Sequence, residues 1–130
     1  MFARVITGAR DILITAPLAT AIGTVLGTAL GLVMGYFRGL TDDVLGRFVE
    51  AFLALPLVVT GILGVVALGA SNGTLIIVIG IVFTPLIART VRAAVLQERE
   101  LDYVSAARLR GESSLYIMFV EILPLSLIHI

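Results

Sequence analysis

The sequence has no cysteine, no lysine and a single histidine, His129, in 130 residues. Without cysteine, the chain has no disulfide framework, no thiolate nucleophile and no zinc-finger spacing. His129 has no second histidine or cysteine near it, so neither a metal site nor a nucleophile–base pair is expected. We therefore expect no catalytic residue, no metal and no cofactor.

Charge is also scarce. Charged residues make up 14% of the chain, the hydrophobic set makes up 59%, and the mean hydropathy is +1.13. A soluble domain of this size needs far more polar surface to cover its core. The nine arginines balance the acidic residues, so the net charge gives no sign of a nucleic-acid partner. The composition predicts an all-α polytopic membrane protein that contacts the lipid bilayer and no nucleic acid.

Long apolar runs account for most of the chain. The expected transmembrane spans cover about 12–37, 48–70 and 74–95, with the start of a fourth at 124–130. A spanning helix needs roughly 20 residues, and the first run has 26 without a charge. Pro56 and Pro85 are expected to kink their helices. The Ser-Asn-Gly sequence at 71–73 predicts a tight turn, because Asn-Gly accepts positive φ angles.

The arginines indicate how these spans are oriented. Three crossings place Arg4 and Arg10 on one side, and the other seven arginines lie on the opposite side. Basic residues beside short loops stay in the cytoplasm, so we expect the polar segment at 97–114 to be cytoplasmic and the N-terminus to lie outside. An outward N-terminus without a preceding span, and an apolar run that stops at Ile130, predict a fragment of a longer protein.

The first span carries glycines at strict four-residue spacing. They are Gly23, Gly27, Gly31, Gly35 and Gly39. Small residues at this spacing allow two helices in a membrane to approach closely. We expect these glycines to form a helix-packing face. The alternative is that they line a substrate path.

The polar segment at 97–114 has a helical pattern of its own. Val104 and Ala107 fall on one face, and most of the acidic residues fall on the other. Gly111 is placed to end this helix in the left-handed conformation. Ser113 or Ser114 can then cap a second helix over 115–123, which stops before Pro124. The predicted geometry is a helix, a glycine corner and a second helix.

Glu121 lies close to the expected membrane surface. A carboxylate at this depth needs a partner, and we expect a salt bridge with Arg89 or Arg92. The alternative is a role in sensing the substrate or nucleotide state.

The polar segment resembles the EAA loop of the permease subunits of ATP-binding cassette (ABC) importers. That pattern is Glu-Ala-Ala, three residues, Gly, nine residues and Ile-x-Leu-Pro. Here Ser-Ala-Ala stands at 105–107, Gly111 follows at the required offset, and Leu-Pro at 123–124 closes the pattern. Ser105 replaces the usual Glu, and Glu121 replaces the usual Ile.

The wider sequence resembles the dipeptide, oligopeptide and nickel branch of these permeases. The similar stretches are Gly-Ala-Arg at 8–10, Gly-Tyr-Phe-Arg-Gly at 35–39 and Asp-Tyr-Val at 102–104. The resemblance covers about residues 4–124. It implies a partial permease domain over 1–130, of the type I importer kind. It also implies a cytoplasmic coupling loop at about 97–123 and a place in the inner membrane of a bacterium or archaeon.

The resemblance also implies partners and site residues. The coupling loop would dock on a cytoplasmic ABC ATPase subunit, which would carry out ATP hydrolysis. The docking residues would be Asp102, Tyr103, Ser105, Ala106, Ala107, Arg108, Gly111, Leu123 and Pro124. A second permease subunit and an extracytoplasmic substrate-binding protein are further implied partners, with a peptide or nickel as the cargo. A non-catalytic membrane scaffold and a permease of another importer branch stay open as alternatives.

Overall fold

The computed structural model describes residues 1–129, with the side chain of His129 excepted, and this part of the chain is helical without a strand. The elements are α1 (Phe2–Tyr36), α2 (Leu40–Leu53), α3 (Leu57–Leu68), α4 (Asn72–Glu98), α5 (Asp102–Leu109), α6 (Ser114–Tyr116), the π-helix η1 (Ile117–Ile122) and α7 (Leu123–His129). The expected all-α membrane fold is confirmed.

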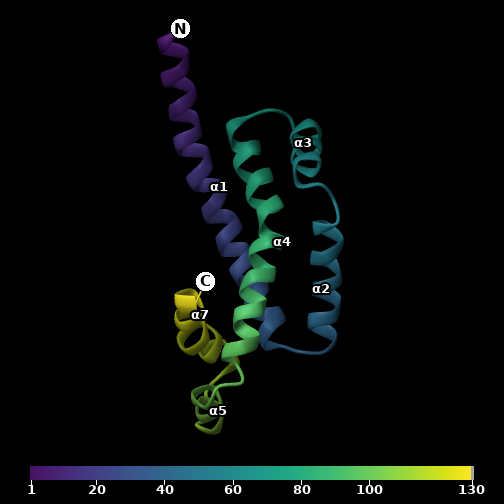
Figure 1. The fold of residues 1–130 in the computed structure, drawn as a ribbon, viewed down its shortest axis with the longest axis vertical. Helices are drawn as coiled ribbons and strands as arrows, with labels where there is room; N and C mark the ends of the chain where they lie inside the picture. The colour runs from purple at the N-terminus through teal and green to yellow at the C-terminus, as the bar shows by residue number, and fades with distance from the viewer. Residues whose placement is uncertain (130) are drawn as a thin grey trace.

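The helices α1 and α4 form the main contact of the structure and run in the same direction (Figure 1). A Cβ added at Gly27, Gly31 or Gly35 would lie 2.6–2.7 Å from the Cβ of Ile87, Val91 or Val95, respectively. At Gly23 it would lie 3.0 Å from a backbone carbonyl oxygen of α4. Such distances leave no room for a side chain, so these four glycines set how closely the helices pack.

Gly39 does not belong to this contact. α1 ends at Tyr36, and Gly39 is the residue before α2, with a φ of 87° and no atom within 4 Å of an added Cβ. Only glycine adopts this conformation without a steric cost. The placement of Gly39 on the packing face is therefore wrong, because the chain uses this glycine to turn from α1 into α2.

The second apolar run is broken rather than continuous. α2 and α3 meet at an angle of 88°, with Pro56 directly before α3. Proline disfavours helical geometry in the preceding residue and lacks the N–H that a continuing helix needs, so the helix is interrupted there. Pro85, by contrast, lies within the continuous helix α4.

Within residues 1–129, two helices, α1 and α4, are long and apolar enough to cross a membrane, and the bent α2–α3 pair meets the same test when it is counted as one span. The bilayer limits at 12–37, 48–70 and 74–95 stay predictions. The last predicted segment, 124–130, includes Ile130, which lies outside the described residues.

The expected tight turn at 71–73 is a helix start instead. The Ser71 hydroxyl accepts a hydrogen bond from the Thr74 N–H at 3.1 Å, which caps α4. The positive φ angle of this connection, 89°, falls at Gly69. The capping Ser satisfies one of the free N–H groups of the first helical turn, and this favours helix from Asn72 onward.

An ion pair attaches α2 to α4. The Arg92 guanidinium donates from Nε to Asp42 Oδ1 and from Nη2 to Asp42 Oδ2, both at 2.6 Å. Two parallel hydrogen bonds fix the relative orientation of the two groups, because both are planar. The first turn of α2 is thereby held on the C-terminal half of α4.

We predict that Gly31→Ala lowers the stability of the α1–α4 pair. Its Cβ would meet the Cβ of Val91 at 2.6 Å and the carbonyl oxygen of Ala88 at 2.7 Å, and overpacking of this kind costs about 1–3 kcal/mol. Gly8→Ala is the matched control, since it adds the same methyl group in α1 with no atom within 4 Å. Thermal unfolding in detergent measures both variants. Equal midpoints for the two would contradict a tight contact at Gly31.

Candidate functional site

The polar segment folds as a short helix that projects beyond α4, at the end of the molecule opposite the N-terminus (Figure 1). α4 ends at Glu98, residues 99–101 form a turn, and α5 covers Asp102–Leu109. Gly111 has a φ of 78°, and the Ser113 hydroxyl accepts a hydrogen bond from the Tyr116 N–H at 3.3 Å. The order of helix, glycine corner and capped second helix is the one that the sequence predicts.

The helix after this corner extends further than expected. α6, η1 and α7 follow one another without a break from Ser114 to His129. Pro124 is the second residue of α7, and the π-helix directly before it changes the backbone hydrogen bonding where proline supplies no N–H. The expected stop between 115–123 and Pro124 is therefore wrong, and the π-helix η1 bridges the two parts.

The two faces of α5 have different surroundings. Val104 and Ala107 are fully buried, in one cluster with Leu32 of α1 and Val95 of α4. Most of the predicted docking residues are exposed, and these are Asp102, Ser105, Ala106, Arg108, Gly111 and Pro124. Tyr103 and Leu123 are half-buried. Because Ala107 faces the protein's own core, the structure does not present it to a partner.

Leu109 is an exposed residue that the sequence reasoning missed. Its side chain is 89% exposed in the last turn of α5. Residues four apart lie on the same side of a helix, which places Leu109 beside Ser105 on the outer face. In the sequence, Leu109 stands between Arg108 and Arg110, away from the long apolar runs, and this placement is the signal that would have identified it.

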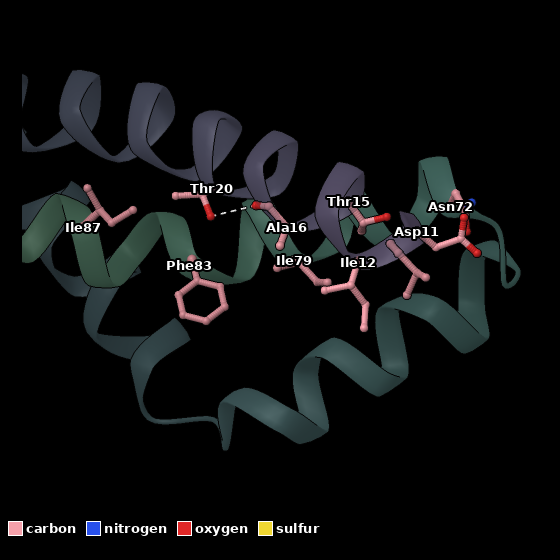
Figure 2. A pocket seen from close by; sticks show the side chains of 10 residues that line it. Asp11, Ile12, Thr15, Ala16, Thr20, Asn72, Ile79, Phe83 and Ile87 are labelled. Atoms are coloured by element: carbon pink, nitrogen blue, oxygen red, sulfur yellow. Dashed lines mark hydrogen bonds between the residues drawn. The ribbon is translucent and has the colours of Figure 1, made fainter. Parts of the chain in front are cut away.

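A groove lies between α1 and α4 near their N-terminal ends (Figure 2). Its volume is about 570 Å³, and Ile12, Ile79 and Phe83 form much of its apolar lining, with Asp11 and Asn72 at one end. None of the four packing glycines lines this groove. Since side chains of α4 fill the space in front of three of these glycines, the structure gives no support to the alternative that the glycines line an open path.

Metal ligands are not gathered in the described part of the chain. Within residues 1–129, no group of three His, Cys, Asp or Glu side chains is placed to hold a metal ion. The side chain of His129 lies outside the described residues. The expectation that the chain holds no cofactor stays a prediction.

The family model described as "Binding-protein-dependent transport system inner membrane component" matches residues 27–130. The chain belongs to this family. The match begins within α1 and covers α2 to α7, so it includes the projecting helix α5 and the glycine corner. The expected recognition as an importer permease and the localisation as a multi-pass inner-membrane protein are confirmed.

Named relatives extend this likeness over nearly the whole chain. The chain is 31% identical to the glutathione transport system permease protein GsiD of Pectobacterium atrosepticum. It is 32% identical to the dipeptide transport system permease protein DppC of Haemophilus influenzae and 36% identical to the di/tripeptide permease protein DppC of Pseudomonas aeruginosa. Each alignment covers 95% of this chain and 41–42% of the relative. The chain therefore spans about two fifths of the length of these relatives.

In this family member, Glu121 pairs within the projecting loop rather than with α4. Arg110 lies 2.8 Å from Glu112 and 3.4 Å from Glu121. The hydrogen bond with Glu112 is the main cause of a raised pKa of Arg110. The expected bridge from Glu121 to Arg89 or Arg92 is wrong, because Arg92 is committed to Asp42 and the loop carries its own arginine.

Tyr103 is tied to the end of α4. Its hydroxyl donates to Glu98 Oε2 at 2.9 Å. Burial, together with the hydrogen bond to Glu98, raises the pKa of Tyr103 to about 12. The fold therefore favours the neutral phenol, which keeps α5 attached to α4 at physiological pH.

We predict that this attachment weakens at alkaline pH. The unfolded chain ionises Tyr103 near pH 10, so its stabilising contribution is complete below about pH 10 and is lost as pH rises towards 12. Between pH 9 and 12, the midpoint temperature of thermal unfolding should fall less steeply with rising pH in Tyr103→Phe than in wild type. The phenolate absorbance that this substitution removes should titrate near pH 12, and a midpoint near 10 would refute the buried hydrogen bond.

Proposed function

We propose that this chain is part of the permease subunit of an ATP-driven importer and that α5 docks on a cytoplasmic ABC ATPase. The observation that supports this most directly is the division of α5 into a buried face and an exposed face. Val104 and Ala107 fix the helix on the membrane helices, while Ser105, Ala106 and Leu109 lie on the outside. Because its buried face is held in the core, α5 can transmit a displacement applied to its exposed face to the membrane helices.

Small side chains suit such a contact. Ser and Ala allow the backbone of α5 to approach a partner closely and lose little side-chain entropy on binding. Leu109 adds exposed apolar surface that a partner would bury on binding. The permease would carry out no chemistry itself. Closure of the ATPase subunits would displace α5, and with it the helices that line the path.

The proposed partners follow from the family. Its description refers to binding-protein-dependent transport, which favours an extracytoplasmic binding protein that delivers the cargo. A second permease subunit would complete the path. We propose a short peptide as the cargo rather than nickel, because the named relatives transport glutathione, dipeptides or di- and tripeptides.

A non-catalytic scaffold is the competing function, and the α1–α4 contact alone would be enough for it. A scaffold has no need of the projecting helix, whereas a permease requires it for coupling. Co-purification with a co-expressed P-loop ATPase distinguishes the two functions.

We predict that Leu109→Glu strongly weakens the association with the ATPase. The change places a charge on the exposed face of α5 and disturbs little internal packing, since Leu109 is 89% exposed. A buried unpaired charge at an interface costs several kcal/mol, so the ATPase should be lost on purification in detergent. Leu109→Met is the matched control and should retain it. Equal retention by Leu109→Glu would argue against docking through this face.

We also predict that a cysteine at position 105 is accessible only from the cytoplasm. Ser105 is exposed on α5, and the described chain has no native cysteine to compete for the label. A membrane-impermeant maleimide should label Ser105→Cys in inside-out vesicles and leave it unlabelled in intact spheroplasts. Labelling in spheroplasts would place α5 outside the cell and exclude contact with an ATPase.

A further inference from the structure

Arg99, in the turn between α4 and α5, reaches across to the end of α1. Its Nη1 donates to the carbonyl oxygen of Tyr36 at 2.7 Å and lies 3.4 Å from that of Gly35. These carbonyls belong to the last turn of α1, where no further helical N–H is available to bind them. A cation at this position also interacts favourably with the helix dipole. Arg99 thus serves as a C-terminal cap of α1 from another part of the chain.

The Arg99 side chain is enclosed as well as bonded. Only 15% of its surface is exposed. Burial is the main cause of a lowered pKa, and the nearby Arg38 and Arg108 act in the same direction. Its Nε has no hydrogen-bond partner and lies 3.7 Å from Glu100 Oε1. A charged group held in such a costly position indicates that its contact with α1 matters to the protein.

Arg108 makes a second connection from α5 to the same turn of α1. Its guanidinium carbon lies 5.3 Å from the centre of the Tyr36 ring, within the range of a cation–π interaction. A third contact, Arg38 to Glu100 at 2.8 Å, is more than half exposed on both sides and contributes little. The two arginines 99 and 108 therefore bracket Tyr36, one at its carbonyl and one at its ring.

These contacts matter because residues 99–101 would otherwise be a hinge. α5 has eight residues and is joined to α4 by this short turn. Burial of Val104 and Ala107 holds α5 in place, but apolar burial is not directional and adds no contact that depends on the angle of α5. Directional contacts from two arginines fix the angle of α5, because both the hydrogen bonds and the ring contact depend on orientation.

We propose that Arg99 and Arg108 are positioning residues that brace α5 against the last turn of α1, so that a displacement of α5 moves the α1–α4 pair as a unit. This inference rests on the proposed function, in which the ATPase supplies the displacement. Without the brace, only the Tyr103–Glu98 hydrogen bond and the packing of Val104 and Ala107 oppose movement at the 99–101 turn. With the brace in place, a displacement of α5 therefore moves α4 and α1 together, although α1 is far from α5 in sequence.

The test measures the distance between spin labels on α1 and α5 in the permease that contains this chain, reconstituted in nanodiscs. Cysteines for the labels replace Val25, which is exposed on α1, and Arg110, which follows α5. In the background of intact Arg99 and Arg108, the distance distribution should be narrow. In Arg99→Met/Arg108→Met it should become at least about twofold broader. In Arg99→Lys/Arg108→Met, the lysine can still donate to the Tyr36 carbonyl. The distance distribution of this variant should be narrower than that of Arg99→Met/Arg108→Met.

A matched control and a second measurement separate the brace from a general structural effect. Arg47→Met removes an exposed arginine of α2 and should leave the distribution unchanged. With the P-loop ATPase bound, addition of MgATP and vanadate should leave the mean distance constant when the brace is intact. The same addition should change the mean distance between the labels in Arg99→Met/Arg108→Met.

The possible outcomes distinguish the brace from the proposed function. Equal widths in the braced and unbraced proteins, or a nucleotide-driven shift with the brace intact, would overturn the inference. Failure of the wild-type permease to bind any co-expressed P-loop ATPase would instead overturn the proposed function. The distribution widths, measured without an ATPase, would still report on the brace itself.

Discussion

The close contact between α1 and α4 is the constraint on which the other parts of this structure depend. Four glycines of α1 leave space for Ile87, Val91 and Val95 and for the backbone of α4. The cluster that buries Val104 and Ala107 of α5 is built on the C-terminal part of this pair. Any change in the spacing of the two helices would therefore displace α5 and its exposed face.

The sequence predicted the parts of the fold that are marked by residues at regular spacing. Glycines every four residues predicted a packing face, and the offsets around Gly111 predicted the helix–corner–helix loop. The prediction was wrong where one residue type serves two purposes. Gly39 continues the spacing of the packing glycines, but its φ of 87° shows a turn, and spacing alone does not distinguish these uses. The helix break near Pro56 was expected as a kink, and its angle depends on contacts beyond the local sequence.

The sequence predicted which segment of the chain forms the candidate site. It did not predict which residues of that segment are exposed. A helical wheel places Ala107 beside Val104, but it does not show which face of a short helix meets the protein. Burial decides that question, and it turns Ala107 inward and Leu109 outward. The contacts of Arg99 were likewise hidden from the sequence, because they join residues more than sixty positions apart. Such partners depend on which helix ends lie together in space.

The α1–α4 contact repeats with the same period on both helices, with Gly27, Gly31 and Gly35 each opposite a β-carbon of α4 sixty residues further on. A slip of one helix by four residues, about 6 Å, would place most of the glycines opposite equivalent branched side chains again. The repeat therefore does not select its own register. Contacts that occur once must do so, and the hydrogen bond from Arg99, just after α4, to the carbonyl oxygen of Tyr36 at the end of α1 is one of them. In this protein, contacts that occur once, at the charged helix end and where Gly80 of α4 accommodates Ile22, select the alignment of the repeated apolar surfaces.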